Sequence, residues 1–410
     1  MSRALRVLVL VCAAGLTAHA QDFSQRGFME ISGNIYPEIV PNDSARGTGE
    51  ARVRYEPKWQ PKPWFTLNAS LEARVDTHRQ DARSLHVDWE DRSLERPALS
   101  VRQLSVVLKR DNVIMTFGKQ FIRWGETDFL NPTDRFAPKD LLTIVDQDVL
   151  AVTAVRLTYT RGDNTLNFVW QPLFTPGRIP LVNQRWTFLP EAFDQFDVEN
   201  LGSKFPGRSS FGARWSRTSA GYECSLSYYD GFNYLPAFNG RVDSTIGRIT
   251  LSPFYPALRL YGGDLAIPLS RFTFKGEAAY YTSPTKQQDS YVLYVIQLER
   301  QIHELRLMFG YIGEVVTGHV EAQEFPGERG FARALIGHAH YMLDSNRILT
   351  LDVFVRQNAR SGLIRPGYSQ SFGDHWRATV GYSWLSGNES DFLGQYHRNS
   401  FASAELRYNF

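Results

Sequence analysis

The sequence contains very little cysteine and, after its first twenty residues, no long apolar segment. Its 410 residues include two cysteines, Cys12 and Cys224, so a fold built on several disulfides or on a cysteine metal cluster is excluded. The absence of any apolar run of roughly eighteen residues after the N-terminal segment excludes membrane-spanning helices. Neither charge sign is in large excess, with 45 basic and 43 acidic residues, and this balance gives no support to nucleic-acid binding.

The first twenty residues have the pattern of an export signal. Arg3 and Arg6 precede an apolar run over residues 7–16, and Ala-His-Ala follows at 18–20. The run is too short to span a bilayer as a helix, and the small-x-small triplet is typical of a signal-peptide cleavage site. We therefore expect residues 1–20 to be a signal peptide and the mature chain, near Gln21–Phe410, to be a single unit, because no linker divides it.

The mature chain repeats one unit of alternating polarity. In residues 376–384 the even positions hold Trp, Ala, Val, Tyr and Trp, and the odd positions hold Arg, Thr, Gly and Ser. The same alternation occurs in 65–74, 272–281, 304–311 and 349–356. A period of two indicates β-strands, and one apolar face per strand indicates a sheet with two different environments.

The connections between these strands alternate in length. Tight turns such as Asp111-Asn112 and Gly373-Asp374 alternate with long polar loops. We expect the long loops at 77–96, 126–148, 175–208, 230–255, 316–329 and 386–398. A soluble β-sandwich also has alternating strands, but charged residues at mid-strand and aromatic residues at strand ends favour a transmembrane barrel. The prediction is an all-β, antiparallel outer-membrane barrel of a Gram-negative bacterium, with about 18 strands (16 as the alternative), short periplasmic turns and long extracellular loops.

The polar faces of such strands would line a lumen. Charges without partners are too costly for a dry interior, so the lumen is expected to be wet, internally paired, or both. Basic residues outnumber acidic ones among the predicted inward positions, which favours anions; the alternative is that neutral pairs brace the wall. The predicted inward residues are Arg52, Arg54, Arg74, Lys109, Arg156, Arg214, Arg259, Lys275, Arg306, Arg356, Arg377 and Arg407, with Glu30, Glu72, Glu223, Glu277, Glu299, Glu304, Asp352 and Glu405.

The stretch TFGKQFIRWGETDFLNPTDRFAPKDLL, residues 116–142, leads from a strand into a long loop. Apolar residues at 113–117 and at 122–124 lie on opposite parities, as if both faced lipid. A β-bulge at Gly118 would reconcile them and turn Lys119 and Arg123 inward, which makes these two residues candidates for a constriction. Three carboxylates follow among prolines, a composition typical of turns in which a carboxylate accepts backbone N–H groups; they are Asp128, Asp134 and Asp140.

This stretch resembles a family signature. GKQFIRWGETD…NPTDRFAPKD is similar to the G-[RK]-Q-x-x-x-W-G-x-x-D…P-x-D motif of a poorly characterised group of Gram-negative porin-like outer-membrane proteins, distantly similar to alginate-export barrels. Residues 255–281 resemble the strand-turn-strand pattern of the same group, with Leu269-Ser270-Arg271 replacing a Gly-Pro turn. The resemblance implies a barrel with a transport-like role and names no solute. For the motif residues Gly118, Lys119, Gln120, Trp124, Gly125 and Asp128 it implies a bulge, an interfacial tryptophan and a loop anchor.

Catalytic patterns are scarce in the sequence. His338 and His340 share one strand face, but no neighbouring residues complete a metal ligand set. No G-x-S-x-G elbow, phosphate-binding glycine loop or H-E-x-x-H helix is present, so we expect neither an enzyme nor a metal or other cofactor.

The chain ends in FASAELRYNF, an alternating strand that reaches the last residue. A terminal aromatic with Tyr408 two residues before it resembles the signal that the barrel-assembly machinery recognises, so Tyr408 and Phe410 are assigned to assembly. The expected partners are therefore that machinery, outer-membrane lipid and an unidentified small solute, with homo-oligomerisation left open.

The sequence is compatible with three functions. The first is a porin-like channel for passive or weakly selective passage of small anionic or hydrophobic solutes. The alternatives are a closed barrel that binds, adheres or assists envelope assembly through its long loops, and an outer-membrane hydrolase.

Overall fold

The computed structural model describes residues 22–187, 197–200, 202–243, 247–320, 323–325, 327–358 and 360–410. The predicted signal peptide lies outside these residues. None of the helices in the described ranges is long and apolar enough to cross a bilayer.

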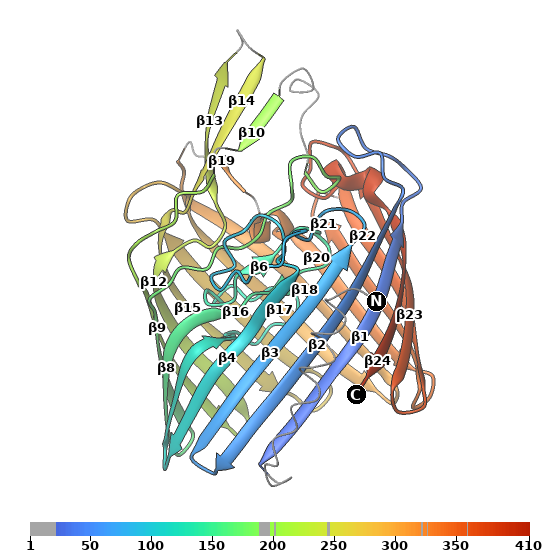
Figure 1. Ribbon diagram of the computed structural model, residues 1–410. Helices are drawn as coiled ribbons and strands as arrows, with labels where there is room; N and C mark the ends of the chain where they lie inside the picture. The colour runs from blue at the N-terminus through green and yellow to red at the C-terminus, as the bar shows by residue number, and fades with distance from the viewer. Residues whose placement is uncertain are drawn as a thin grey trace.

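Eighteen antiparallel strands form one closed sheet (Figure 1). Each strand pairs with the next along the barrel, and the last pairs with the first. The predicted count of eighteen is confirmed, and closure leaves no unpaired edge inside lipid. The barrel strands are β1 (Phe23–Ile35), β2 (Gly47–Lys62), β3 (Phe65–Asp76), β4 (Leu99–Arg110), β5 (Val113–Gln120), β8 (Val152–Arg161), β9 (Asn164–Gln171), β11 (Ser210–Ser219), β12 (Tyr222–Phe232), β15 (Ala257–Pro268), β16 (Thr273–Thr282), β17 (Ser290–Ile302), β18 (Leu305–Gly318), β20 (Ala334–Met342), β21 (Arg347–Arg356), β22 (Ser361–Phe372), β23 (Trp376–Gly387) and β24 (Phe401–Asn409).

The two rims of the barrel differ as predicted. Short turns, such as 63–64 and 111–112, join strands at the rim where β1 begins and β24 ends. Long connections such as 77–98 and 121–151 join them at the opposite rim. Because the strand number is even, both ends of the barrel chain lie at the short-turn rim, which is the periplasmic one in such proteins.

The outward faces are apolar. Trp376, Val380 and Trp384 are 46%, 51% and 53% exposed on β23, which confirms the predicted parity of this strand. One predicted lumen residue is wrong: Arg259 faces outward, because its neighbours Leu258 and Leu260 are buried on the inward face of β15. Near the long-loop rim it pairs with Asp230 at 2.8 Å.

The expected bulge at Gly118 is absent. The pairing of β5 with β4 and with β8 runs through Gly118 without a register shift. Gly118 has φ +107, a conformation open to glycine, and Lys119 follows it in regular register, opposite Leu104 and Thr153. The irregularity lies in the neighbouring pair, where β3 and β4 change register at Ser70 and Leu71.

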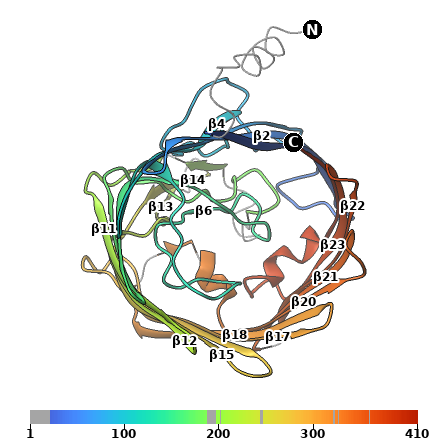
Figure 2. The same cartoon turned by 90° about the horizontal axis from the view of Figure 1, so that it is seen from below.

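Further elements lie at the long-loop end. A small sheet of β10 (Asp197–Asn200), β13 (Ala237–Asp243), β14 (Arg248–Phe254) and β19 (Gln323–Glu324) rises above the rim (Figure 1). The pair β6 (Lys139–Asp140) and β7 (Asp148–Val149) lies inside the ring of strands when the barrel is viewed along its axis (Figure 2). The short helices η2 (Gly327–Phe331) and η3 (Gly394–Asn399) complete this end.

The last residue closes the barrel. The Phe410 backbone exchanges hydrogen bonds with Gly27, with N···O distances of 2.9 and 3.0 Å. The Phe410 ring lies over Gly27, where a Cβ atom would come within 2.6 Å of it. The same Cβ atom would lie even closer to the backbone carbonyl oxygen of Arg54, so the neighbouring strand and the terminal ring together exclude a side chain at position 27.

Candidate functional site: a lumen divided by an inward-folded loop

The connection 121–151, here called the lumen loop, packs inside the barrel. Ile122, Trp124, Leu130 and Phe136 are at most 4% exposed. They share one hydrophobic cluster with inward residues of strands β8 to β21, namely Val152, Ala154, Val169, Tyr229, Leu258, Leu260, Ala279, Tyr281, Tyr291, Leu293, Val295, Ile312, Ala334, Ile336 and Phe354. One side of the lumen is thus apolar and filled by the loop.

Two sequence interpretations of the lumen loop are corrected by this packing. Ile122 and Trp124 do not face lipid, because β5 ends at Gln120 and both side chains turn into the lumen. Trp124 is not interfacial either, since its ring packs edge-on against Phe136 with centroids 5.2 Å apart.

Glu277 on β16 is the main attachment point of the loop. Its buried carboxylate accepts hydrogen bonds from the backbone N–H and hydroxyl groups of Thr133, both at 2.8 Å. It also accepts the hydroxyl of Thr127 at 2.8 Å and the N–H of Glu126 at 3.1 Å. Gly125 has φ +99, and a Cβ there would lie 2.5 Å from the carboxylate, so the motif glycine permits this close approach.

Asp128 provides a second attachment, as expected of a loop anchor. Its carboxylate receives the Lys275 ammonium at 2.8 Å and the side-chain amide of Gln297. Its own N–H donates to the Gln297 side chain at 3.1 Å. Neighbouring strands β16 and β17 therefore hold the start of the lumen loop.

The middle of the loop is tied to η2. Arg135 pairs with Glu328 at 2.5 Å, and the Tyr234 hydroxyl donates to the same carboxylate at 2.7 Å. Burial alone would raise the pKa of Glu328, but the charges of Arg135 and Lys139 lower it to about 2. The carboxylate therefore stays ionised and paired.

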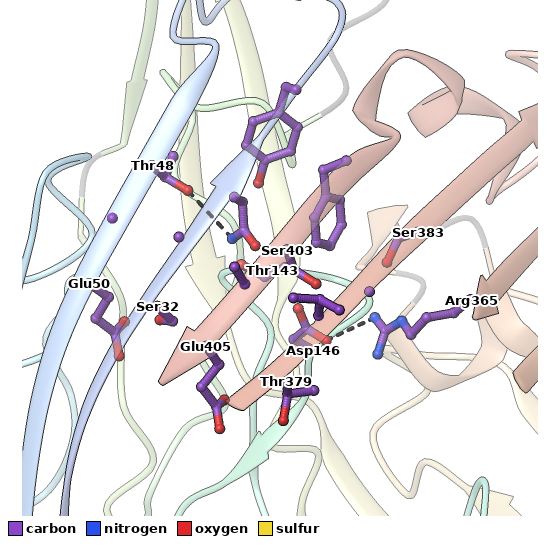
Figure 3. Close-up of a pocket in the computed structure, with 18 of the residues that line it drawn as sticks. Ser32, Thr48, Glu50, Thr143, Asp146, Arg365, Thr379, Ser383, Ser403 and Glu405 are labelled. Atoms are coloured by element: carbon purple, nitrogen blue, oxygen red, sulfur yellow. Dashed lines mark hydrogen bonds and ion pairs between the residues drawn. The ribbon is translucent and has the colours of Figure 1, made fainter. Parts of the chain in front are cut away.

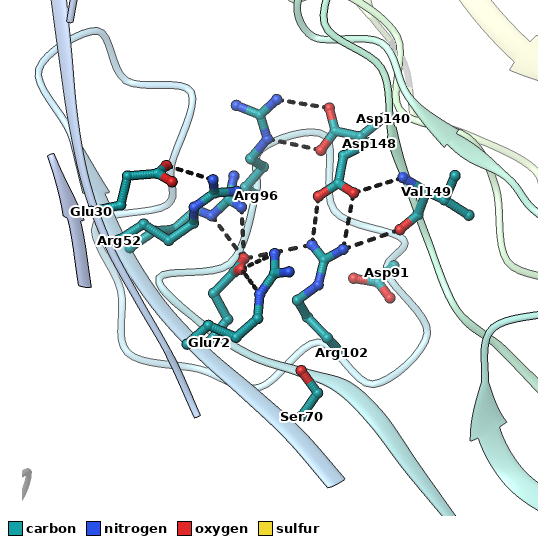
Figure 4. A network of polar contacts seen from close by, with 12 residues as sticks. Glu30, Arg52, Ser70, Glu72, Asp91, Arg96, Arg102, Asp140, Asp148 and Val149 are labelled. Carbon is teal, nitrogen blue, oxygen red and sulfur yellow. Dashed lines mark hydrogen bonds and ion pairs between the residues drawn. The ribbon is translucent and has the colours of Figure 1, made fainter. Parts of the chain in front are cut away.

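A chain of ion pairs joins three long connections at the end of β5. Lys119 reaches Asp91 at 2.5 Å, Asp91 reaches Arg178 at 2.8 Å, and Arg178 reaches Asp140 at 3.2 Å. Asp140 also pairs with Arg96 at 2.8 Å (Figure 4). Lys119 is 1% exposed, so its predicted place in an open constriction is wrong: the ammonium is enclosed by its partner from loop 77–98.

The wall formed by β24, β1, β2, β3 and β4 carries paired charges. Glu30 accepts from Arg52 at 2.5 Å and from Arg407 at 2.7 Å. Glu72 pairs with Arg54 and Arg74 at 2.5 and 2.6 Å. Figure 4 shows Glu30 and Glu72 of this wall near Arg96 and Asp140. These contacts match the bracing alternative, in which inward charges stabilise the wall.

A polar cavity of about 510 Å³ lies next to the wall formed by β21–β24, β1 and β2 (Figure 3). Hydroxyl side chains line it, and the carboxylates of Glu50 and Glu405 point into it. Tyr36, Trp186 and Phe401 contribute aromatic rings. The hydroxyl residues are Ser32, Thr48, Thr143, Thr350, Thr379, Ser383 and Ser403.

The structure places the remaining predicted residues in different settings. Arg123 is exposed, with its side chain 63% accessible and 3.8 Å from the buried Asp134. Arg214 pairs with Asp264 and Arg306 with Glu299. Arg156 donates to Asn167, and Gln120 donates to the Ala154 carbonyl. Arg356 donates to the Gly330 and Ala332 carbonyls. Asp352 and Glu405 line the polar cavity. Arg377 follows the inward parity of β23 and lies opposite Arg407.

Sequence reasoning missed several residues of the cavity. Asp146, Arg185 and Trp186 come from long connections, and Arg365 comes from β22. Strand alternation gives no information about residues in loops that fold inward. For Arg365 the signal was present, because it lies directly opposite the predicted inward residue Asp352.

His338 hydrogen-bonds Asp352 through Nδ1 at 2.6 Å. Within the described part of the chain, no group of three or more His, Cys, Asp or Glu side chains is placed to hold a metal ion.

The fold and this lumen define an eighteen-stranded β-barrel whose fold is similar to that of outer-membrane porins. Similar solved structures are OccAB3 of Acinetobacter baumannii (TM-score 0.53, 8% identity, 95% of this chain and 98% of that one) and OccAB4 of the same organism (TM-score 0.53, 8% identity, 95% and 97%). Wzi, an Escherichia coli outer-membrane protein involved in group 1 capsule assembly and described as a carbohydrate-binding β-barrel, is similar over 99% of this chain and 87% of its own (TM-score 0.51, 10% identity). No protein-family model and no curated protein sequence matches the chain. These likenesses show the fold alone.

Proposed function

We propose that this protein is an outer-membrane channel that passes small solutes through the polar side of its lumen. The observation that carries the proposal is the cavity of about 510 Å³ between the lumen loop and the wall of β21–β24 and β1–β2. Its hydroxyl and charged lining replaces part of a solute's hydration, while the loop narrows the path. Pore dimensions and lining groups of this kind set selectivity in channels.

The charge of the cavity differs from the predicted basic excess. Its lining contains six acidic residues, Glu30, Glu50, Asp76, Asp146, Asp352 and Glu405, and four arginines, Arg52, Arg96, Arg185 and Arg365. Two of the acidic residues, Glu50 and Glu405, are 23% and 31% exposed at the side chain. We therefore assign the channel a weak preference for cations in place of the expected preference for anions.

Conductance of the purified protein in planar bilayers tests this function. Discrete ion-conducting steps are expected, with the reversal potential in a KCl gradient shifted toward K⁺. Replacing Glu50 and Glu405 by Gln should reduce that shift, whereas Asp163→Asn, on an exposed periplasmic turn, should leave it unchanged. An electrically silent barrel would refute the channel; steps with a shift toward Cl⁻ would refute only the charge assignment.

The second candidate is a closed barrel that binds a partner or ligand. The dense packing of the lumen loop favours it, because this loop fills one side of the interior. The carbohydrate binding of the similar barrel Wzi gives glycans as the first ligands to test. A silent barrel that binds oligosaccharides in calorimetry would support this candidate. A screen with lipid and peptide substrates addresses the hydrolase alternative.

A further inference from the structure

A second, smaller cavity adjoins the polar one. It has a volume of about 250 Å³ and shares Asp352 and Arg365 with the larger cavity. Apart from these two residues and Gln147 its lining is apolar; the apolar residues are Phe129, Leu130, Ile144, Val145, Ile312, Phe331, Val353, Phe354 and Leu363. We call it the side pocket.

One segment of the lumen loop separates the two cavities. Thr143 and Asp146 line the polar cavity, whereas Ile144, Val145 and Gln147 line the side pocket. The segment thus presents polar groups to one space and mainly apolar groups to the other. A solute that enters from the polar cavity meets an abrupt change of polarity at Asp352 and Arg365.

The two charged residues at this junction do not neutralise each other. Asp352 and Arg365 are direct cross-strand partners on β21 and β22, an arrangement that usually favours an ion pair. Each turns to another group instead: Asp352 bonds His338 through Oδ1 at 2.6 Å, and Arg365 reaches Asp146 Oδ1 at 2.8 Å and the Val145 carbonyl at 2.9 Å.

The junction consequently offers acceptors to a cationic group. The Asp352 and Asp146 side chains are 35% and 53% exposed, and the bonds above use one oxygen of each carboxylate. The Arg365 guanidinium pairs with Asp146 alone, which leaves Asp352 without an arginine partner among the described residues, and the whole polar cavity has six acidic residues against four arginines. A carboxylate ligand would meet repulsion here, whereas an ammonium group would be attracted.

The size of the side pocket limits its occupant. An apolar protein cavity of roughly 150 Å³ lined by Leu, Ile and Phe binds benzene. At about 250 Å³ the side pocket has room for one aromatic ring with a short substituent. Burial of that ring against Phe129, Phe354 and Leu363 would supply the hydrophobic part of the binding free energy.

We propose that the side pocket and its mouth form a binding site for amphipathic organic cations, with an aromatic ring in the pocket and a primary ammonium between Asp352 and Asp146. The site deepens the proposed function, on which it rests, by naming a solute class that the channel would retain and pass. Arg365 holds Asp146 in place at the mouth and disfavours binding of a second cation.

Three probes with the same ring and different charge test the site. They are 2-phenylethylammonium, neutral 2-phenylethanol and anionic 3-phenylpropionate, each measured by calorimetry with the detergent-solubilised barrel and by block of the K⁺ current in bilayers. The amine should bind roughly tenfold more tightly than the alcohol, which corresponds to one partly desolvated ion pair, and the acid should bind more weakly than either. Because calorimetry does not need conduction, a silent barrel that binds the amine would refute the channel and leave the site standing.

Matched variants localise the binding. Asp352→Asn should weaken binding of the amine roughly tenfold and leave binding of the alcohol unchanged. Asp146→Asn should change the amine affinity in the same direction. Leu363→Gln should weaken the binding of both the amine and the alcohol, because it places a polar group in the side pocket. Asp163→Asn is the control and should change neither. Tighter binding of the acid than of the amine, or equal amine affinity of folded Asp352→Asn protein and the wild type, would overturn the proposal.

Discussion

At the scale of single residues, Asp81 is the least satisfied carboxylate of the described chain. It lies in loop 77–98, is 1% exposed, and neither of its side-chain oxygens has a hydrogen-bond partner. Burial is the largest influence and raises the pKa of Asp81 to about 7, against the opposing charge of Arg74. Below about pH 7 the folded protein therefore favours the protonated form of this residue.

This raised pKa predicts a pH dependence of stability. The folded state binds a proton at Asp81 that the unfolded state releases near pH 4, so the free energy of unfolding should fall as pH rises from about 4 to about 7. Asp81→Asn should make this fall less steep and should raise the free energy of unfolding at pH 8 by roughly 1 kcal/mol. Thermal unfolding of the barrel in detergent at pH 5 and pH 8 measures both; an unchanged pH slope in the variant would contradict the assignment.

Alternation of polarity predicts the orientation of a single side chain well where the strands on both sides of it also belong to the barrel wall. Trp384 and Arg407 face the predicted sides for this reason. Lys119 shows the limit of the method, because its burial depends on Asp91 from a connection whose path the strand pattern does not encode.

At the scale of elements, the start of the lumen loop depends on a few attachment points on β16 and β17. Glu277 alone accepts N–H and hydroxyl groups of Thr127 and Thr133. Loss of a buried acceptor leaves these donors unsatisfied, at a cost of roughly 1–3 kcal/mol for each buried polar group.

Glu277→Gln should therefore loosen the lumen loop. The NH2 group introduced by this substitution faces N–H and hydroxyl donors and cannot accept their hydrogen bonds. We therefore expect larger and noisier single-channel conductance and faster tryptic cleavage within 121–151. Glu223→Gln is the matched control, because Glu223 also lies on an inward strand face but is exposed. Unchanged conductance and cleavage in Glu277→Gln would show that the remaining contacts suffice to hold the loop.

The sequence places this loop at 126–148, close to the observed 121–151, and identifies Asp128 as an anchor. Its inward path was not predictable, because the apolar residues that receive it are spread over strands β8 to β21. Strands β15, β16 and β17 each contribute two or three of them, and the polarity of a strand does not show whether an apolar face meets lipid or an inward-folded loop.

At the scale of the whole molecule, closure depends on the seam between β1 and β24. The strand number followed from turn chemistry and strand parity, which are local features of the sequence. The sequence therefore predicts the barrel wall better than the path of the loops inside it. The seam also ends in a residue whose ring covers Gly27.

Deletion of Phe410 should impair insertion much more than it changes the conductance of the molecules that do insert. The deletion removes both the backbone bonds to Gly27 and the terminal ring. Quantification of heat-modifiable barrel in outer-membrane fractions measures insertion, and Phe410→Tyr, which keeps an aromatic terminus, is the control. Equal insertion of the deleted and complete chains would refute the role of Phe410 in assembly.

The attachment of the lumen loop to two adjacent strands has a consequence for engineering. Lys275, Glu277 and Gln297 hold the start of the loop, whereas its later part is held by Glu328 and by the partners of Asp140. A graft of the loop into another eighteen-stranded scaffold would therefore have to carry both sets of partners to reproduce its path.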